Sequence, residues 1–104
     1  MPNETADVEL FNKIFNYIVE NNTSEICKLL KSGDFVNISN VYGNSPLIWA
    51  SYFGRIDIVK LFLEYGVDIN FKDEYEKTSL HEACRGGYLE MAKILIDHGA
   101  IFNA

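Results

Sequence analysis

The sequence repeats itself at a fixed spacing, the distance from Ser45 to Thr78, and this period constrains the fold more than any other feature. Three residues show the register, since Ser45, Leu47 and Ala50 are followed at that distance by Thr78, Leu80 and Ala83. Further pairs in the same register are Gly54 and Gly87, Val59 and Ala92, Leu61 and Ile94, Phe62 and Leu95, Leu63 and Ile96, Gly66 and Gly99, and Asn70 and Asn103. A fixed period of this length is typical of stacked repeat proteins, in which neighbouring units bury a shared core.

The same register continues more weakly toward the N-terminus. Gly33 and Asn37 precede Gly66 and Asn70 by one period. Four apolar positions match as well, with Ile14, Ile26, Leu29 and Leu30 preceding Leu47, Val59, Phe62 and Leu63. The sequence therefore predicts a first unit that shares the helices of the other two but is less regular.

Two hexapeptides identify the kind of repeat. They are Ser45-Pro46-Leu47-Ile48-Trp49-Ala50 and Thr78-Ser79-Leu80-His81-Glu82-Ala83, and both are similar to the motif T-P-L-H-x-A. The chain resembles the ankyrin-repeat family, strongly over residues 40–104 and weakly over residues 7–39. The resemblance implies an all-α solenoid of about three helix-turn-helix units with short β-hairpin-like loops. The expected division is a flexible N-terminus (1–6), a degenerate capping repeat (7–39), a repeat (40–72) and a C-terminal repeat (73–104).

Apolar spacing and capping residues predict the helices of the first unit. Apolar residues recur every three or four positions over residues 7–20, which predicts an amphipathic helix that ends at Asn21. Thr23 or Ser24 is expected to cap the next helix, because either hydroxyl can accept a hydrogen bond from a free N–H group. That helix is expected to end before Gly33.

The second and third units differ at two turn positions. In the second unit Ser45 is expected at the start of a helix, with Pro46 in the first turn, where a missing N–H costs nothing. The third unit has Glu76 where the second has Gly43, and Ser79 where the second has Pro46. These two changes predict a slightly looser loop in the third unit.

Composition and charge exclude several classes of function. The chain has 104 residues, is 48% hydrophobic and carries a net charge of −6, with a pI near 4.7. Because binding to nucleic acid requires a basic face, nucleic acid is not an expected partner. The acidic balance either favours a partner with a basic patch or serves solubility. Neither a signal peptide nor a membrane-spanning run is visible, so a cytoplasmic, intracellular location is expected, in the host cytosol for a pathogen effector.

Few residues indicate a catalytic or metal-binding site. Cys27 and Cys84 lie in predicted helices of different units and are interpreted as small buried apolar groups. His81 and Cys84 could form a nucleophile–base pair or contribute to a zinc site, but no second cluster supplies more ligands. The resemblance instead implies that His81 hydrogen-bonds the loop backbone. We therefore expect neither an enzyme nor a metal or cofactor site.

The resemblance also marks a candidate binding surface, because ankyrin-like proteins use their hairpin tips and the exposed face of each first helix. The residues carried over to this surface are Val41, Tyr42, Asn44, Tyr52, Phe53, Lys72, Glu74, Tyr75, Lys77 and Arg85. Exposed aromatic side chains are typical of interface hot spots. Phe53 and Tyr75 have an alternative role, which is to pack against the loops, and Trp49 is expected to fill a gap between helices.

The predicted function is protein–protein interaction without catalysis, as an intracellular scaffold module. Two alternatives stay open. One is a fragment of a longer regulatory or effector protein of the same family. The other is homo-association through the C-terminal edge, because the predicted last helix (residues 89–97) carries Met91, Ile94, Leu95 and Ile96, and a terminal repeat requires a polar outer face or a partner.

Overall fold

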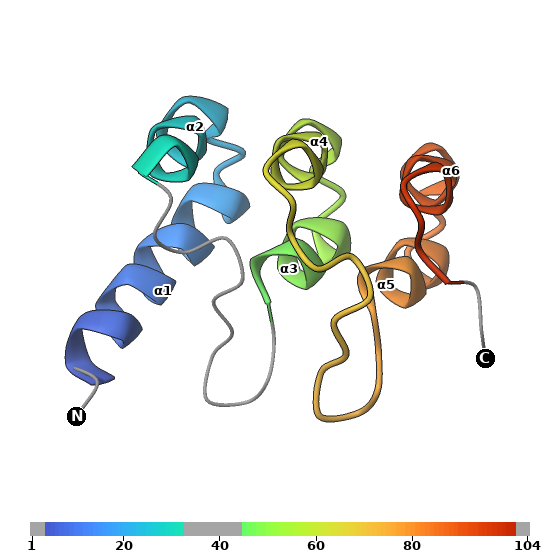
Figure 1. Ribbon diagram of the computed structural model, residues 1–104, viewed down its shortest axis with the longest axis horizontal. Coiled ribbons are helices and arrows are strands. Elements are labelled where there is room, and N and C mark those ends of the chain that lie inside the picture. Colours follow the sequence, from blue (N-terminus) through green and yellow to red (C-terminus); the bar gives the residue numbers. More distant parts are fainter. Residues whose placement is uncertain (1–3, 33–44, 102–104) are drawn as a thin grey trace.

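The computed structural model describes residues 4–32 and 45–101, with side chains described from residue 9 onward. Six helices follow one another in this part of the chain, and none of it forms a strand. The helices are α1 (Glu4–Val19), α2 (Thr23–Ser32), α3 (Pro46–Tyr52), α4 (Ile56–Glu64), α5 (Ser79–Arg85) and α6 (Leu89–Asp97). They form three antiparallel pairs, with α1, α3 and α5 in one layer and α2, α4 and α6 in the other (Figure 1). The predicted all-α solenoid is confirmed.

The core lies between the two layers and runs the length of the stack. The fully buried side chains include Ile14 and Ile18 of α1, Phe62 of α4, and Met91 and Leu95 of α6. They recur at three- and four-residue spacing because only one face of each helix turns inward. Burial of each such side chain contributes about 1.5–3 kcal/mol.

The first residue of each repeat signature caps the N-terminal end of a helix, α3 in the second unit and α5 in the third. The Ser45 hydroxyl accepts a hydrogen bond from the Ile48 N–H at 3.2 Å, and Pro46 occupies the first turn as predicted. In the third unit Thr78 and His81 form a capping box. The His81 Nδ1 atom accepts a hydrogen bond from the Thr78 N–H at 3.0 Å, which confirms the role that the family resemblance implies for this histidine.

Two boundaries in the first unit differ from the prediction. Helix α1 begins at Glu4, ahead of the expected start at Asp7, so the polar residues that precede the apolar pattern are also helical. The prediction that Thr23 or Ser24 caps α2 is wrong, since Asn22 Oδ1 accepts the Glu25 N–H at 3.2 Å. The chain reverses at Asn21, which has a φ of +56°, and this places Asn22 rather than Thr23 just outside the helix.

Residues 65–78 join α4 to α5 and extend beyond the layer of α1, α3 and α5 (Figure 1). At the tip Glu76 has a φ of +61°, which is unfavourable for a residue with a side chain. Asp73 braces this tip, because its Oδ1 accepts the N–H groups of Tyr75 and Lys77 at 2.9 and 2.8 Å. The Asp73 N–H in turn donates to the Lys77 carbonyl at 2.9 Å, which closes a hairpin-like turn. Gly43, the equivalent of Glu76, lies outside the described residues.

Neighbouring units are joined by side chains that reach back along the stack. Arg55 donates from Nε to the Ile18 carbonyl at 3.0 Å and from Nη2 to the Val19 carbonyl, which satisfies the C-terminal end of α1. Tyr88, which follows Arg55 by one repeat period, places its ring against Gly54 of the preceding unit. These two residues occupy equivalent positions, just before α4 and α6, so the same position connects both pairs of units.

The interpretation of both cysteines as buried groups is wrong. Cys27 is half-buried and Cys84 is exposed. Ser51 occupies the equivalent of Cys84 in the second unit and is fully buried, in a helix that packs against α5. Helix α5 has no such neighbour on its far side within the described residues, so the same position is left open. In this part of the chain no helix combines the length and apolarity needed to cross a bilayer.

Candidate protein-binding groove

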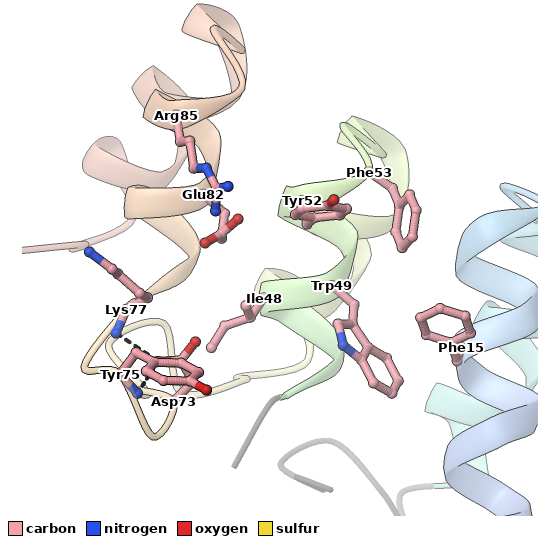
Figure 2. Close-up of a pocket in the computed structure, with 10 residues that line it drawn as sticks. All are labelled: Phe15, Ile48, Trp49, Tyr52, Phe53, Asp73, Tyr75, Lys77, Glu82 and Arg85. Atoms are coloured by element: carbon pink, nitrogen blue, oxygen red, sulfur yellow. Dashed lines mark hydrogen bonds between the residues drawn. The ribbon is translucent and has the colours of Figure 1, made fainter. Parts of the chain in front are cut away.

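A groove of about 570 Å³ runs across the face formed by α1, α3, α5 and the tip of the loop before α5 (Figure 2). Each of the three units contributes side chains to it. They are Phe15 from α1, Ile48, Trp49, Tyr52 and Phe53 at α3, Asp73, Tyr75 and Lys77 from the loop, and Glu82 and Arg85 from α5. The groove therefore depends on the stacking of the units and is not present in any one of them.

One wall of the groove is a cluster of aromatic rings that fixes α1 against α3. The Trp49 ring lies edge-on to Phe11 and Phe15, with centroid distances of 4.3 and 4.5 Å. Phe53 contacts Phe15 at 5.8 Å and Tyr52 at 5.0 Å, again edge-on. Each such contact adds about 0.5–1.5 kcal/mol beyond the buried area. Trp49 thus fills the space between helices, and the half-buried Phe53 packs against Phe15 of α1 and Tyr52 of α3, not against the loops as its alternative role had it.

Two tyrosines on this face are more exposed than the rings of the aromatic cluster and contribute less to packing. Tyr52 is 54% exposed and Tyr75 is 74% exposed, although both line the groove. Ile48 points from α3 toward Tyr75, and together they narrow the end of the groove near the loop (Figure 2). Exposed aromatic rings beside a hollow offer a large contact area at a small cost in side-chain entropy.

The opposite wall is charged. Glu82 and Arg85 project from α5 toward α3, and Lys77 lies at the loop end (Figure 2). Among the described residues the salt bridge is that of Lys28 with Glu25, so none of these three groove side chains is paired. The groove therefore combines an apolar wall with unpaired charged groups.

The structure brings together half of the residues predicted for partner binding. Tyr52, Phe53, Tyr75, Lys77 and Arg85 all line the groove.

The other predicted residues lie elsewhere. Lys72 lines a separate hollow of about 310 Å³ with His81, and Glu74 is exposed at the loop but is not part of the groove wall. Val41, Tyr42 and Asn44 lie outside the described residues.

Five groove residues were not predicted from the sequence, namely Phe15, Ile48, Trp49, Asp73 and Glu82. The repeat register contained the signal for some of them. Glu82 follows Trp49 by one repeat period and Phe15 precedes Ile48 by the same distance, so equivalent helix positions face the groove in successive units. The contribution of Asp73 to the groove could not be predicted from the sequence, because it depends on how the loop folds.

The described side chains include no group of three or more His, Cys, Asp and Glu residues placed to hold a metal ion. His81 uses Nδ1 to cap α5, and Cys84 is exposed on the same helix. The groove thus offers an apolar contact surface and charged groups, and the residues that line it do not include a nucleophile–base pair.

Comparison with known proteins gives consistent matches. A family model described as ankyrin repeats (three copies) matches residues 13–104. Alpha-latrocrustotoxin-Lt1a of Latrodectus tredecimguttatus is 30% identical over 98% of this chain and 7% of its own length. Serine/threonine-protein kinase VIK of Arabidopsis thaliana is 31% identical over 94% of this chain and 23% of its own length. Protein phosphatase 1 regulatory subunit 27 of Homo sapiens is 47% identical over 56% of this chain and 38% of its own length. The chain thus spans well under half of the length of each of these relatives.

Proposed function

The chain belongs to the ankyrin-repeat family, whose repeats are generally protein-interaction modules, and from this premise we propose that it binds a partner protein through the groove and the hairpin tip beside it. The module acts without catalysis. Its mechanism is to present a contact surface that is already ordered, so that little conformational entropy is lost when a partner docks.

The observation that carries the proposal is the exposure of Tyr52 and Tyr75 at the edges of one groove that three units build. The aromatic wall beside Tyr52 is ordered by the Trp49 contacts to α1, and the loop that carries Tyr75 is ordered by the hydrogen bond from the Tyr75 N–H to Asp73. Helices α3 and α5 have seven residues each, a length of about 10 Å at 1.5 Å per residue. The groove therefore suits a short segment or one exposed corner of a folded partner.

The relatives support a binding role and leave open a place in a larger assembly. One relative is named as a regulatory subunit of a phosphatase, and another is named as a kinase. Since the chain matches only part of each, a second reading is that it serves as the repeat segment of a longer regulatory or effector protein. In both readings its own contribution is recognition.

The proposal is tested by affinity capture from a lysate of the source cell, with wild type and three variants as baits. Tyr52→Ala and Tyr75→Ala remove the exposed rings of the groove. Tyr65→Ala is the matched control, because Tyr65 is 39% exposed at the end of α4, away from the groove. We expect mass spectrometry to identify a protein that is bound by wild type and Tyr65→Ala and lost from both groove variants. Equal capture by all baits would place the binding surface elsewhere.

Homo-association is the second candidate, favoured by exposed apolar side chains on α6. Leu89 is 79% exposed and Ile96 is 47% exposed, whereas the Met91 and Leu95 side chains point into the core. The outer edge is thus less apolar than the sequence predicted, but it is not fully polar. Sedimentation equilibrium of the wild type and of Leu89→Lys would decide this point, since a dimer through this edge must weaken in the variant.

A further inference from the structure

We propose that the groove selects a partner segment in which a large apolar side chain lies next to a carboxylate. The apolar side chain packs against the exposed ring of Tyr52, and the carboxylate binds Arg85. This inference rests on the proposed function and specifies the chemistry of the partner.

The first step of the argument is the position of Arg85. A second hollow, of about 380 Å³, adjoins the groove and is lined by Tyr52, Phe53, Glu82, Arg85, Gly86 and Tyr88. Four of these residues also line the groove, so the two hollows form one channel along the seam between α3 and α5. Arg85 lies in the shared part. A segment that runs along this seam must therefore pass the guanidinium group.

The second step concerns which charges of the channel are available. Asp73 is half-buried, and its Oδ1 already accepts two backbone N–H groups. Glu82 is also half-buried, whereas Lys77 and Arg85 are exposed and neither forms an ion pair with a described residue. The exposed charges of the channel are thus the two cations, whereas the Glu82 carboxylate, likewise unpaired among the described residues, lines both hollows but is less exposed. A guanidinium group binds a carboxylate through two parallel hydrogen bonds, which a lysine cannot reproduce.

The third step weighs these local charges against the net charge of −6. Charges on the exposed surface are screened over a distance of about 8 Å at physiological ionic strength. A carboxylate seated in the channel therefore interacts mainly with the charges that line it, and only weakly with the acidic residues of the remote surface. The lining charges are the exposed cations Arg85 and Lys77 and the less exposed carboxylates of Glu82 and Asp73. The overall acidity favours basic partners at long range, and the channel favours an acidic residue at contact. The two expectations lead to opposite results in a binding selection.

The test is selection of peptides from a random display library on the full chain. Three proteins are compared, namely wild type, Arg85→Glu and the control Lys93→Glu. Lys93 is exposed on α6 outside the groove, so both variants have the same net charge and differ only in where the charge changes. We expect wild type and Lys93→Glu to enrich peptides with an aromatic or aliphatic residue next to Asp or Glu, and Arg85→Glu to lose this preference.

Affinities of the enriched peptides supply the quantitative criterion. Fluorescence anisotropy should show a loss of roughly tenfold for Arg85→Glu and little change for Lys93→Glu, because the reversal removes the carboxylate–guanidinium contact and also places two like charges side by side. Arg85→Gln removes the charge without reversing it and is measured in case the reversal destabilises the end of α5. Circular dichroism checks that all variants are folded.

The outcomes separate the inference from the proposed function. Basic peptides whose binding is lost in Tyr52→Ala would overturn the charge preference and leave the groove as the binding site. Peptides that bind Tyr52→Ala as tightly as wild type, or no enrichment at all, would overturn both. A wild-type dimer that Arg85→Glu abolishes would identify a second copy as the occupant and would overturn the separate partner.

Discussion

Three glycines allow the cost of a left-handed backbone to be separated from the cost of displacing the Tyr88 ring. Gly66 has a φ of +81° and open space around its Cα, so Gly66→Ala introduces backbone strain alone. Gly86 has an ordinary φ of −81°, but an added Cβ would lie 2.6 Å from the Tyr88 ring. Gly54 combines both features, with a φ of +71° and an added Cβ at 2.8 Å from the same ring. Gly54→Ala should therefore combine the backbone strain of one site with the ring displacement of the other.

The magnitudes follow from these geometries. Strain in the left-handed region costs about 1–2 kcal/mol, and any Gly→Ala change recovers about 0.4–1 kcal/mol through the unfolded chain. Gly66→Ala should thus lower the free energy of unfolding by about 1 kcal/mol. Displacing a ring that is 36% exposed falls at the low end of overpacking costs, about 1 kcal/mol. Gly86→Ala should then be close to neutral and Gly54→Ala should cost about 2 kcal/mol.

Urea denaturation of the single variants and of the same variants in a Tyr88→Ala background provides the assay. Without the ring, Gly54→Ala should cost no more than Gly66→Ala, and Gly86→Ala should become stabilising by about 0.4–1 kcal/mol. In a chain of this size, about 1 kcal/mol corresponds to a change in Tm of about 4–8 °C, so these differences are measurable. Equal costs at Gly54 and Gly66 in both backgrounds would refute the position assigned to the Tyr88 ring.

Three further substitutions test other parts of the fold. Arg55→Ala should lower the free energy of unfolding by about 1–2 kcal/mol, because two charge-assisted bonds to α1 are lost, and Arg55→Lys should be intermediate; urea curves that match wild type would contradict these bonds. Glu76→Gly should stabilise by about 0.5–1 kcal/mol by relieving its positive φ, whereas Asp73→Ala should speed hydrogen exchange at the Tyr75 amide; a destabilised Glu76→Gly or unchanged exchange would count against the loop geometry. Cys84→Ser should change the thermal midpoint by less than the equivalent of about 0.5 kcal/mol, and a larger loss would show that the thiol is not at the surface.

The repeat register was sufficient to predict the helix pairs, because the residues that set it are structural. Ser45 and Thr78 begin helices by accepting a backbone hydrogen bond, and the predicted last helix over residues 89–97 is α6. The register failed where environment differs at equivalent positions. Ser51 and Cys84 are one repeat period apart, yet one is buried and the other exposed, since among the described units only the inner one has a neighbour on both sides. Sequence equivalence specifies a position within a unit and not what lies next to that unit.

The sequence predicted only some of the groove residues, because the repeat register marks equivalent positions and not their surroundings. Tyr52 and Arg85 occupy equivalent positions on exposed helix faces, so the family resemblance was enough to mark them. Phe15 belongs to the first unit, where the repeat pattern is weak and no groove residue was expected. Asp73 contributes by accepting N–H groups within its own loop, a contact that depends on the fold of the loop tip.

The order of the aromatic wall of the groove depends on a residue that does not line the groove. This wall joins the first unit to the second, and Arg55 fixes the two units through the carbonyl groups at the end of α1. Loss of this contact would let α1 move relative to α3, although every groove side chain would be retained. Part of the benefit of a preordered surface would then be lost as an entropy cost on binding. Arg55→Ala should therefore lower the affinity for a peptide selected on the wild type. Tyr65→Ala should not, although Tyr65 also lies outside the groove. Isothermal titration calorimetry measures both affinities, and an unchanged affinity in Arg55→Ala would show that the aromatic contacts of Trp49 alone keep this wall in place.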